Sequence, residues 1–194
     1  QLASDTGKHD SAIKLYETIL ANRRDTTLVP YALYGKGWSQ MQLGNHKDAL
    51  ASLDSILADS PTHPLADDAL IARGISHRTL GNFDQARADL SKYLDSAPEG
   101  INLGHALYES AIVDQKPARP ADAAKKLQRL ITQVPKYPGM DKVLYELGWS
   151  LRESGNNADA VKRFRELLDR YPETSLAAEA AYFVGQQSYS AADW

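Results

Sequence analysis

Side chains that could do chemistry are scattered through this sequence of 194 residues instead of being gathered into motifs. There is no cysteine, which excludes disulfides, thiolate metal ligands and cysteine nucleophiles. The sequence has no glycine-rich phosphate loop, no pair of histidines at metal-ligand spacing and no nucleophile elbow. We therefore expect no catalytic residue, no metal site and no cofactor, and we expect that the chain is not an enzyme.

One pair of carboxylates allows an alternative interpretation. Glu109 and Glu146 lie 37 residues apart, which would place them on corresponding helices if the chain is built from repeats of that length. As a pair, the two carboxyl groups could serve in acid–base catalysis. We interpret both residues as solubilising helix positions or as part of a polar groove wall.

The overall charge gives no sign of a nucleic-acid or membrane partner. Twenty-two basic residues face 25 acidic ones, so the formal net charge is -3. No apolar run approaches the roughly 20 residues that a membrane-spanning helix needs. Residues 116–136 are a local exception, since six basic side chains there face Asp122 alone. We interpret them as a solvated face, with an alternative in which Lys125, Lys126 and Arg129 form a secondary surface for an acidic partner or membrane headgroups.

The elements that carry these residues recur every 37 residues, which several independent columns of the sequence show. The alanine column is Ala12, Ala49, Ala86, Ala123 and Ala160. The column of small residues is Gly37, Gly74, Ala111, Gly148 and Gly185. The proline column is Pro61, Pro98, Pro135 and Pro172. Columns that share one period predict a stack of similar structural units.

Each unit is predicted to contain two helices. In residues 144–151 apolar side chains recur every three to four residues, and residues 160–168 repeat this pattern after a break at Gly155-Asn156-Asn157. The proline column ends the second helix. Glycine inside a helix costs roughly 1 kcal/mol relative to alanine. The glycine column, which falls in the middle of the first helix, therefore predicts close approach of a neighbouring helix.

The pattern Leu144-Tyr145-Glu146-Leu147-Gly148, followed by Ala160, Phe164 and Pro172, resembles the tetratricopeptide repeat. This resemblance implies an all-α fold, a right-handed superhelix (solenoid) of stacked helix pairs. The usual family period is 34, and the three extra residues lie in linkers such as residues 135–139. Linkers of this length are similar to those in the bacterial envelope branch of the family. That branch includes the periplasmic partner of the Tol-Pal system and the outer-membrane assembly lipoprotein. A periplasmic or envelope location is accordingly favoured over a cytoplasmic one.

The domain organisation follows from the period. We expect a single array over residues 1–194, cut from a longer protein. The predicted repeats are 1–28 (partial), 29–65, 66–102, 103–139, 140–176 and 177–194 (partial).

The resemblance also implies where a partner would bind, since first-helix residues line the concave groove of such arrays. Positions spaced by four and then three residues lie on one face of a helix, and tyrosine and tryptophan are the residue types that anchor recognition. An inter-repeat core position is the alternative for each of these residues. The predicted groove residues are Tyr34, Trp38, Met41, Ile71, Arg78, Tyr108, Tyr145, Trp149, Arg152 and Tyr182.

Polar residues depart from the family pattern at positions around the small residue of the first helix, where apolar residues are usual. Either these helices are rotated, or the polar side chains enter the groove themselves. The residues concerned are Lys36, Gln40, Arg73, His77, Ser110 and Asp114.

The function expected from these features is a protein–protein interaction scaffold that binds an extended or helical segment of a partner protein in its groove. One alternative is a non-catalytic arm of a larger enzyme or sensor. Another is a structural spacer that associates with itself through the ends of the array. We expect a protein or peptide as partner, with neither nucleic acid nor membrane insertion.

Overall fold

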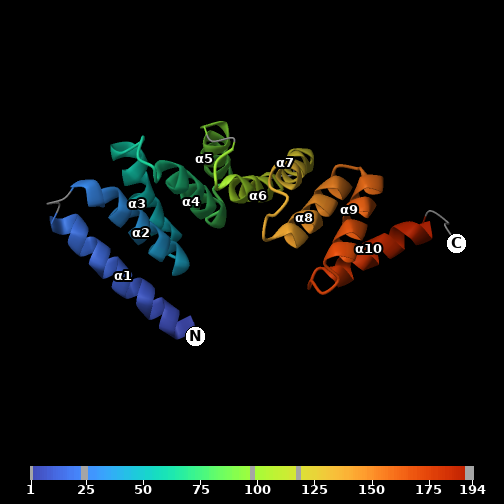
Figure 1. The fold of residues 1–194 in the computed structure, drawn as a ribbon, viewed down its shortest axis with the longest axis horizontal. Coiled ribbons are helices and arrows are strands. Elements are labelled where there is room, and N and C mark those ends of the chain that lie inside the picture. The colour runs from blue at the N-terminus through green and yellow to red at the C-terminus, as the bar shows by residue number, and fades with distance from the viewer. Residues whose placement is uncertain (1, 23–25, 97–98, 117–118, 191–194) are drawn as a thin grey trace. The chain divides into compact units, whose positions relative to one another are not determined.

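The computed structural model describes residues 2–22, 26–96, 99–116 and 119–190, and within these all regular secondary structure is helical (Figure 1). The predicted all-α fold of helix pairs is confirmed. The helices are α1 (Leu2–Asn22), α2 (Val29–Gln42), α3 (His46–Asp59), α4 (Ala66–Thr79), α5 (Phe83–Ser96), α6 (Leu103–Asp114), α7 (Pro120–Gln133), α8 (Met140–Glu153), α9 (Asn157–Arg170) and α10 (Ala177–Ser190), with a 3-10 turn, η1 (Thr26–Leu28), before α2. None of these helices combines the length and the apolar character needed to cross a membrane.

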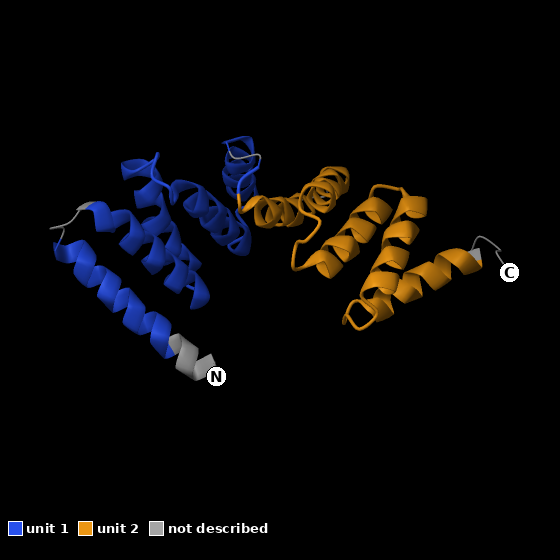
Figure 2. Cartoon of the chain, in the orientation of Figure 1, with its two compact units in different colours: residues 1–100 blue, residues 101–194 orange. Residues whose placement is uncertain are grey.

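The chain divides into two compact units, residues 1–100 with α1–α5 and residues 101–194 with α6–α10 (Figure 2). Inside each unit every helix packs against the helix that precedes it and the helix that follows it in the chain. Helices α2, α4, α6, α8 and α10 begin where the 37-residue period places the start of each repeat. We call these the first helices, and α3, α5, α7 and α9 the second helices.

The turn between the two helices of a pair depends on glycine at three places. Gly44, Gly81 and Gly155 have φ angles of 77°, 80° and 86°, a left-handed conformation that other residues rarely adopt. These glycines allow the chain to reverse within a few residues, so that the second helix packs directly on the first.

The glycines in the middle of the first helices make the predicted close contacts. A Cβ atom added to Gly37 or Gly74 would lie 3.3 or 2.9 Å from the Cγ atom of Leu53 or Leu90, respectively. One added to Gly148 would lie 2.6 Å from the ring of Phe164. The second helix therefore sits against the backbone of the first. The fourth glycine of the column, Gly185 in α10, has no such atom within 4 Å.

Four of the six polar residues beside the glycine column pair with second helices, an arrangement that neither of the two sequence-based expectations describes. These four are Gln40, Arg73, Ser110 and Asp114. In α4, the Arg73 guanidinium donates to both carboxylate oxygens of Asp89 in α5, at 2.9 and 2.6 Å, and to Asp54 in α3 at 2.6 Å. In α2, Gln40 accepts a hydrogen bond from Ser52 in α3 at 3.1 Å. These polar pairs replace apolar contacts inside the helix–helix interfaces.

The third helix pair has the same arrangement with the charges reversed. Lys126 in α7 donates to Ser110 at 2.7 Å and to the buried carboxylate of Asp114, both in α6. In the first unit, Lys36 in α2 forms an ion pair with Glu17 in α1 at 2.9 Å. These polar side chains are therefore part of the packing between helices.

Candidate functional site

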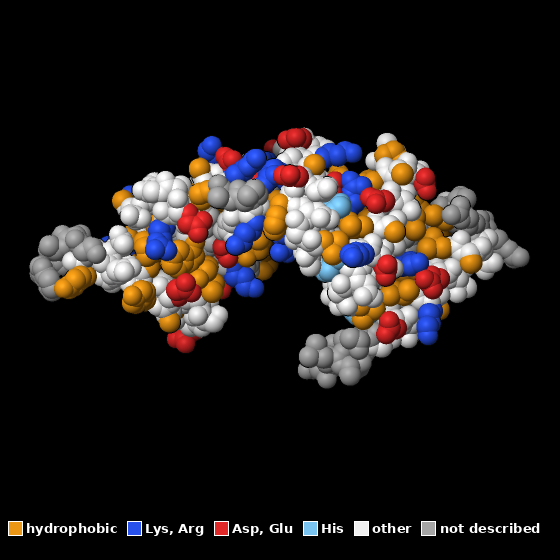
Figure 3. Space-filling view, turned by 180° about the vertical axis from the view of Figure 1, so that it is seen from behind, with side chains coloured by type: hydrophobic (Ala, Val, Ile, Leu, Met, Phe, Trp, Pro, Cys, Tyr) orange, Lys and Arg blue, Asp and Glu red, His pale blue; other side chains and the backbone are white. Residues whose placement is uncertain are grey.

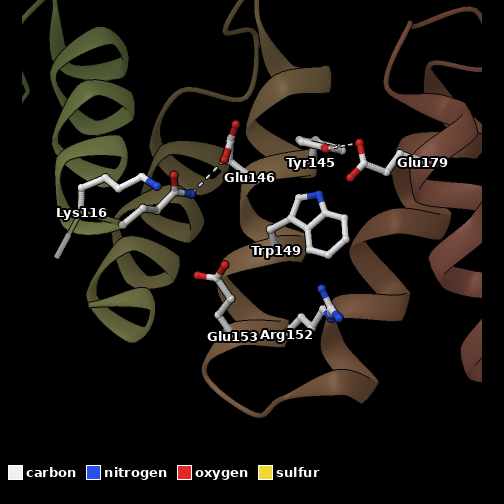
Figure 4. A pocket seen from close by; sticks show the side chains of 8 residues that line it. Lys116, Tyr145, Glu146, Trp149, Arg152, Glu153 and Glu179 are labelled. Atoms are coloured by element: carbon white, nitrogen blue, oxygen red, sulfur yellow. Dashed lines mark hydrogen bonds between the residues drawn. The ribbon is translucent and has the colours of Figure 1, made fainter. Parts of the chain in front are cut away.

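A cleft of about 460 Å³ opens in the second unit, where the first helices of three consecutive repeats contribute side chains (Figure 4). Most of the lining comes from one face of α8, with further residues from the turn directly after α6 and from the start of α10. The lining residues are Gln115, Lys116, Tyr145, Glu146, Trp149, Arg152, Glu153 and Glu179.

Trp149 forms the floor of the cleft and also belongs to an aromatic cluster that joins three helices. Its ring centroid lies 5.4 Å from that of Phe164 in α9 and 5.8 Å from that of Phe183 in α10, and the two phenylalanine rings are 5.1 Å apart. Phe164 and Phe183 are buried, whereas Trp149 is only partly covered. Edge-to-face packing of this kind fixes ring orientation, so the indole is held rigidly at the cleft.

Arg152 lies over the aromatic floor. The carbon at the centre of its guanidinium is 4.9 Å from the Trp149 centroid and 5.4 Å from the Phe183 centroid, within the range of cation–π attraction. The side chain is exposed and forms no ion pair with any residue that the structure describes. Its hydrogen-bond donors are therefore available to a ligand that rests on the indole.

Tyr145 forms one wall through a hydrogen bond to the next repeat. Its hydroxyl donates to Glu179 Oε2 in α10 at 2.6 Å (Figure 4). Burial raises the pKa of Tyr145 to about 12, and the hydrogen bond to Glu179 contributes to the increase. The phenol is therefore neutral at physiological pH and acts as a fixed donor.

The opposite wall is also ordered by a side-chain amide. Gln115, directly after α6, donates from Nε2 to Glu146 Oε2 at 2.8 Å and to Ser150 Oγ at 3.2 Å. Glu153 and Lys116 also line the cleft, and neither forms an ion pair with a described residue. Three glutamates thus face one lysine and one arginine around an aromatic floor.

The arrangement of these side chains suits non-covalent binding of another side chain. The cleft combines an indole surface, hydrogen-bond donors on Arg152 and three carboxylates, which together can hold a side chain with apolar and charged parts. The described residues contain no group of three or more histidine, aspartate or glutamate side chains placed to hold a metal ion. The carboxylates considered as an acid–base pair have separate environments: Glu109 is buried 3.7 Å from His105 Nε2, and Glu146 accepts from Gln115.

Three of the predicted groove residues, Tyr145, Trp149 and Arg152, meet in this cleft. Trp149 is both a groove residue and an inter-repeat core residue, since one part of its ring packs between repeats and another faces the cleft. Tyr182 lies on α10 and is 71% exposed. Tyr108 stacks against Tyr137, with the ring centroids 6.3 Å apart.

In the first unit, the prediction for Met41 and Ile71 is wrong, because both side chains are buried, at 9% and 4% exposure. Met41 packs in a core cluster with Leu53 and Ile56 of α3, so that a partner cannot reach it. The alternative of a core position applies to these two residues.

The other three predicted groove residues of the first unit have different degrees of exposure. Tyr34 is half-buried against the same core cluster as Met41, and burial raises its pKa. Trp38 is 42% exposed on α2, and Arg78 is half-buried near the end of α4.

The proposed secondary basic surface is smaller than its residue types indicate. Lys126 is committed to Asp114 and Ser110, which removes its charge from the surface. Lys125 lies 3.4 Å from Asp122, and Arg129 donates to Gln133 at 2.6 Å. On the face shown in Figure 3, basic and acidic side chains are interspersed.

The sequence analysis missed Glu153 and Glu179 in the cleft. Glu153 lies four residues after Trp149 and Glu179 three residues before Tyr182, so each shares a helix face with a predicted groove residue. Extending each aromatic column by one helical turn would have found both carboxylates.

Comparison with known families identifies the repeats. Two tetratricopeptide repeat models match the chain, one over residues 1–64 and 34–101 and the other over residues 142–174. No curated protein matches the chain in sequence.

Several solved structures share the fold. YrrB, described as a tetratricopeptide repeat protein with an unusual peptide-binding site, aligns with a TM-score of 0.73 and 18% identity, over 93% of this chain and 87% of YrrB. MamA from Desulfovibrio magneticus RS-1 gives a TM-score of 0.66 and 15% identity, over 87% of this chain and 97% of MamA. PilF of Pseudomonas aeruginosa aligns with a TM-score of 0.68 and 20% identity, over 85% of this chain and 70% of PilF. At these identities the likeness concerns the fold alone.

Proposed function

Because the chain belongs to the tetratricopeptide repeat family, we propose that it is a non-catalytic interaction module that binds a segment of a partner protein at the cleft formed by α6, α8 and α10. The observation that carries this proposal is the exposed Arg152 guanidinium stacked on an indole that buried neighbours hold in place. A rigid aromatic surface with unsatisfied donors at its edge is typical of an anchoring site for a partner side chain.

The chemistry of the cleft defines the segment it would take. Trp149 offers apolar area, Arg152 can pair with a carboxylate, and Glu153 can pair with a basic side chain. An extended or helical peptide that presents an apolar side chain flanked by charges of both signs would meet all three. The peptide-binding site named for YrrB supports a peptide ligand.

The experiment is a selection of peptide ligands on the immobilised chain, followed by affinity measurements on charge-reversal variants. Arg152→Glu and Glu153→Lys alter exposed residues of the cleft. Arg165→Glu makes the same charge change as Arg152→Glu on an exposed position of α9 outside the cleft and is the matched control. We expect the selected peptides to lose about tenfold or more in affinity with Arg152→Glu, as expected for a charged hydrogen-bonding contact, and to keep it with Arg165→Glu. Peptides that bind the Arg152→Glu and Arg165→Glu variants with equal affinity would contradict the proposal.

A location in the bacterial envelope is a further part of this proposal. It is supported by the 37-residue period and the long linkers, which are similar to those of envelope members of the family. Fractionation of the source cells with an antibody against the chain tests it, and recovery in the cytoplasmic fraction alone would refute it.

A further inference from the structure

A second hollow in the second unit lies between α7 and α8, on the side of α8 that faces away from the cleft. Leu147 and Leu151 follow the cleft residues Tyr145 and Trp149 by two positions each, and two positions turn a helix by about 200°. The volume of this hollow is about 420 Å³, which lies within the range of roughly 300–1,000 Å³ typical of ligand sites. We call it the apolar slot, and its lining includes Ala121, Ala124, Lys125 and Gln128 of α7 and Leu147 and Leu151 of α8.

The two leucines distinguish this slot from the equivalent places on the preceding first helices. There the positions of Leu147 and Leu151 hold polar residues, several of which bond to a neighbouring helix, as Lys36 bonds to Glu17. A leucine makes no such bond, so in α8 the floor of the hollow is apolar. The polar residues of the two columns are Lys36, Arg73 and Ser110, and Gln40, His77 and Asp114.

The first unit has a hollow of nearly the same size at the equivalent place. Its volume is about 430 Å³, and Glu17, Lys36 and Asp48 are among the residues that line it. Gln128 of the apolar slot stands three 37-residue periods after Glu17. A hollow of this size therefore follows from the repeat geometry, and the residues of each repeat determine which chemical groups it accepts.

The polar groups around the apolar slot are hydrogen-bond donors. Lys125 is 79% exposed, and its contact with Asp122 at 3.4 Å is a surface ion pair of the kind that contributes little to stability. The amide oxygen of Gln128 accepts from Arg163 in α9 at 3.1 Å, which leaves the amide nitrogen as a donor. None of the described residues that line the slot has a carboxylate, whereas three glutamates line the cleft. The slot is therefore complementary to a carboxylate beside an apolar side chain.

We propose that the apolar slot binds an acidic segment of a second partner protein. The segment inserts a large apolar side chain against Leu147 and Leu151 and places an aspartate or glutamate beside Lys125. Because the slot and the cleft lie on opposite faces of α8, the chain can hold two partner segments at once. This binding is separate from peptide binding at the cleft and goes beyond the function proposed above.

The test is a selection of displayed random peptides on the immobilised Arg152→Glu variant, in which the cleft is altered. Affinities of the enriched peptides are then measured for further variants made in the same Arg152→Glu background. Lys125→Glu reverses the charge at the slot, and Lys125→Arg keeps it. Lys162→Glu is the matched control, because Lys162 stands one period after Lys125, is also exposed and also pairs with an aspartate three residues before it.

A further variant tests the apolar floor. Leu151→Gln introduces the residue that α2 has at this position, Gln40, and makes the floor polar without a change of charge. Leu151 is half-buried, so circular dichroism and thermal unfolding check that the variant folds.

We expect the enriched peptides to share a large apolar residue next to aspartate or glutamate. They should lose about tenfold or more in affinity with Lys125→Glu and with a folded Leu151→Gln variant, and keep it with Lys125→Arg and Lys162→Glu. The absence of any enriched peptide would overturn the proposal. So would peptides whose affinity Lys125→Glu lowers no more than Lys162→Glu does, or a loss with Lys125→Glu that a folded Leu151→Gln variant does not share.

A membrane surface is the other acidic surface that Lys125 would attract. If vesicles of phosphatidylglycerol bind the chain, Lys125→Glu abolishes this binding and no peptide is enriched, the lysine serves a membrane contact and the proposal is refuted. Failure of the slot leaves the cleft proposal intact, because the cleft is tested by Arg152→Glu with peptides selected on the unaltered chain.

Discussion

The α4–α5 pair of the first unit and the α8–α9 pair of the second have the same backbone contact and different side-chain chemistry around it. In both, a large side chain of the second helix lies on a glycine of the first, Leu90 on Gly74 and Phe164 on Gly148. Beside this contact the first pair has an ion pair between Arg73 and Asp89. The second pair has an aromatic cluster that reaches the surface at Trp149.

The difference shows that two sets of positions have separate roles. The glycine and its covering residue set how closely two helices approach, so they must be small on one side and large on the other. The neighbouring positions tolerate either an ion pair or an aromatic cluster. A cleft can therefore form beside a recurring backbone geometry, because the geometry does not depend on the residues that line the cleft.

The largest effect is expected from removing the centre of the aromatic cluster. Phe164→Ala should lower the free energy of unfolding by about 3–5 kcal/mol, because the buried ring contacts Gly148, Tyr145, Trp149 and Phe183. Urea unfolding measures the loss, and the near-ultraviolet circular dichroism of the folded variant should weaken as Trp149 loses its neighbour. Leu90→Ala is the equivalent change in the α4–α5 pair. If Phe164→Ala lowers the free energy of unfolding by less than Leu90→Ala does, the aromatic cluster does not add the stability assigned to it.

A somewhat smaller effect is expected from breaking the ion pair of the first unit. Arg73→Met leaves the buried Asp89 carboxylate without its partner and should cost about 2–3 kcal/mol, below the range for a fully buried pair because Arg73 is partly exposed. Adding Asp89→Leu should recover most of this loss, since the pair is then replaced by apolar residues. A double variant as unstable as the single one would show that the polar contact itself is required.

Smaller changes in the free energy of unfolding are expected at Gly148 and Gly185, which occupy the same position in two repeats. Gly148→Ala should destabilise the chain by about 1–2 kcal/mol, because the crowding against Phe164 exceeds the gain in helix propensity. Gly185→Ala should instead stabilise it by about 0.5–1 kcal/mol, since its Cβ enters open space. Urea unfolding measures both changes in the free energy of unfolding. Effects of the same sign would refute the contact assigned to Gly148.

The smallest effect concerns pH. The pKa of Tyr145 is raised to about 12 in the folded chain, from about 10 for an unperturbed tyrosine. Its contribution to stability is therefore complete below pH 10 and is lost as the pH rises from about 10 to 12. In an absorbance titration of tyrosinate, Tyr145→Phe should lack a step near pH 12 that the wild type shows. A variant that keeps the step near pH 12 would contradict the burial and the hydrogen bond assigned to this phenol.

The fold could be predicted from the sequence because it depends on columns of small residues that recur with one period. Glycine in the middle of four first helices predicted close helix contacts. Leu53, Leu90 and Phe164 make them at Gly37, Gly74 and Gly148, whereas Gly185 has no such neighbour within 4 Å. These contacts join residues only 16 positions apart in the chain, so a repeated local pattern was enough to specify them.

The site could be predicted only in part, because a column defines the face of a helix and not what covers that face. Met41 and Arg152 occupy the same column, yet Met41 is buried among residues of α3 and α4 and Arg152 is exposed. The flexible methionine side chain fills space beside Ala69 and Ala72 of the next first helix. Packing of that kind depends on the sizes of neighbours in two other helices, which spacing along one helix does not contain.

The polar contacts between helices also have a consequence for the order in which the chain acquires its structure. Arg73 bonds to partners 16 and 19 residues away, and Lys126 to partners 12 and 16 residues away. Such short separations let each helix find its partner soon after both leave the ribosome, as expected for folds rich in local contacts. The charges differ from one helix pair to the next. If α5 packed on α6 in place of α7, Asp89 would take the position of Lys126 and lie near Asp114. This repulsion disfavours mispaired intermediates during synthesis.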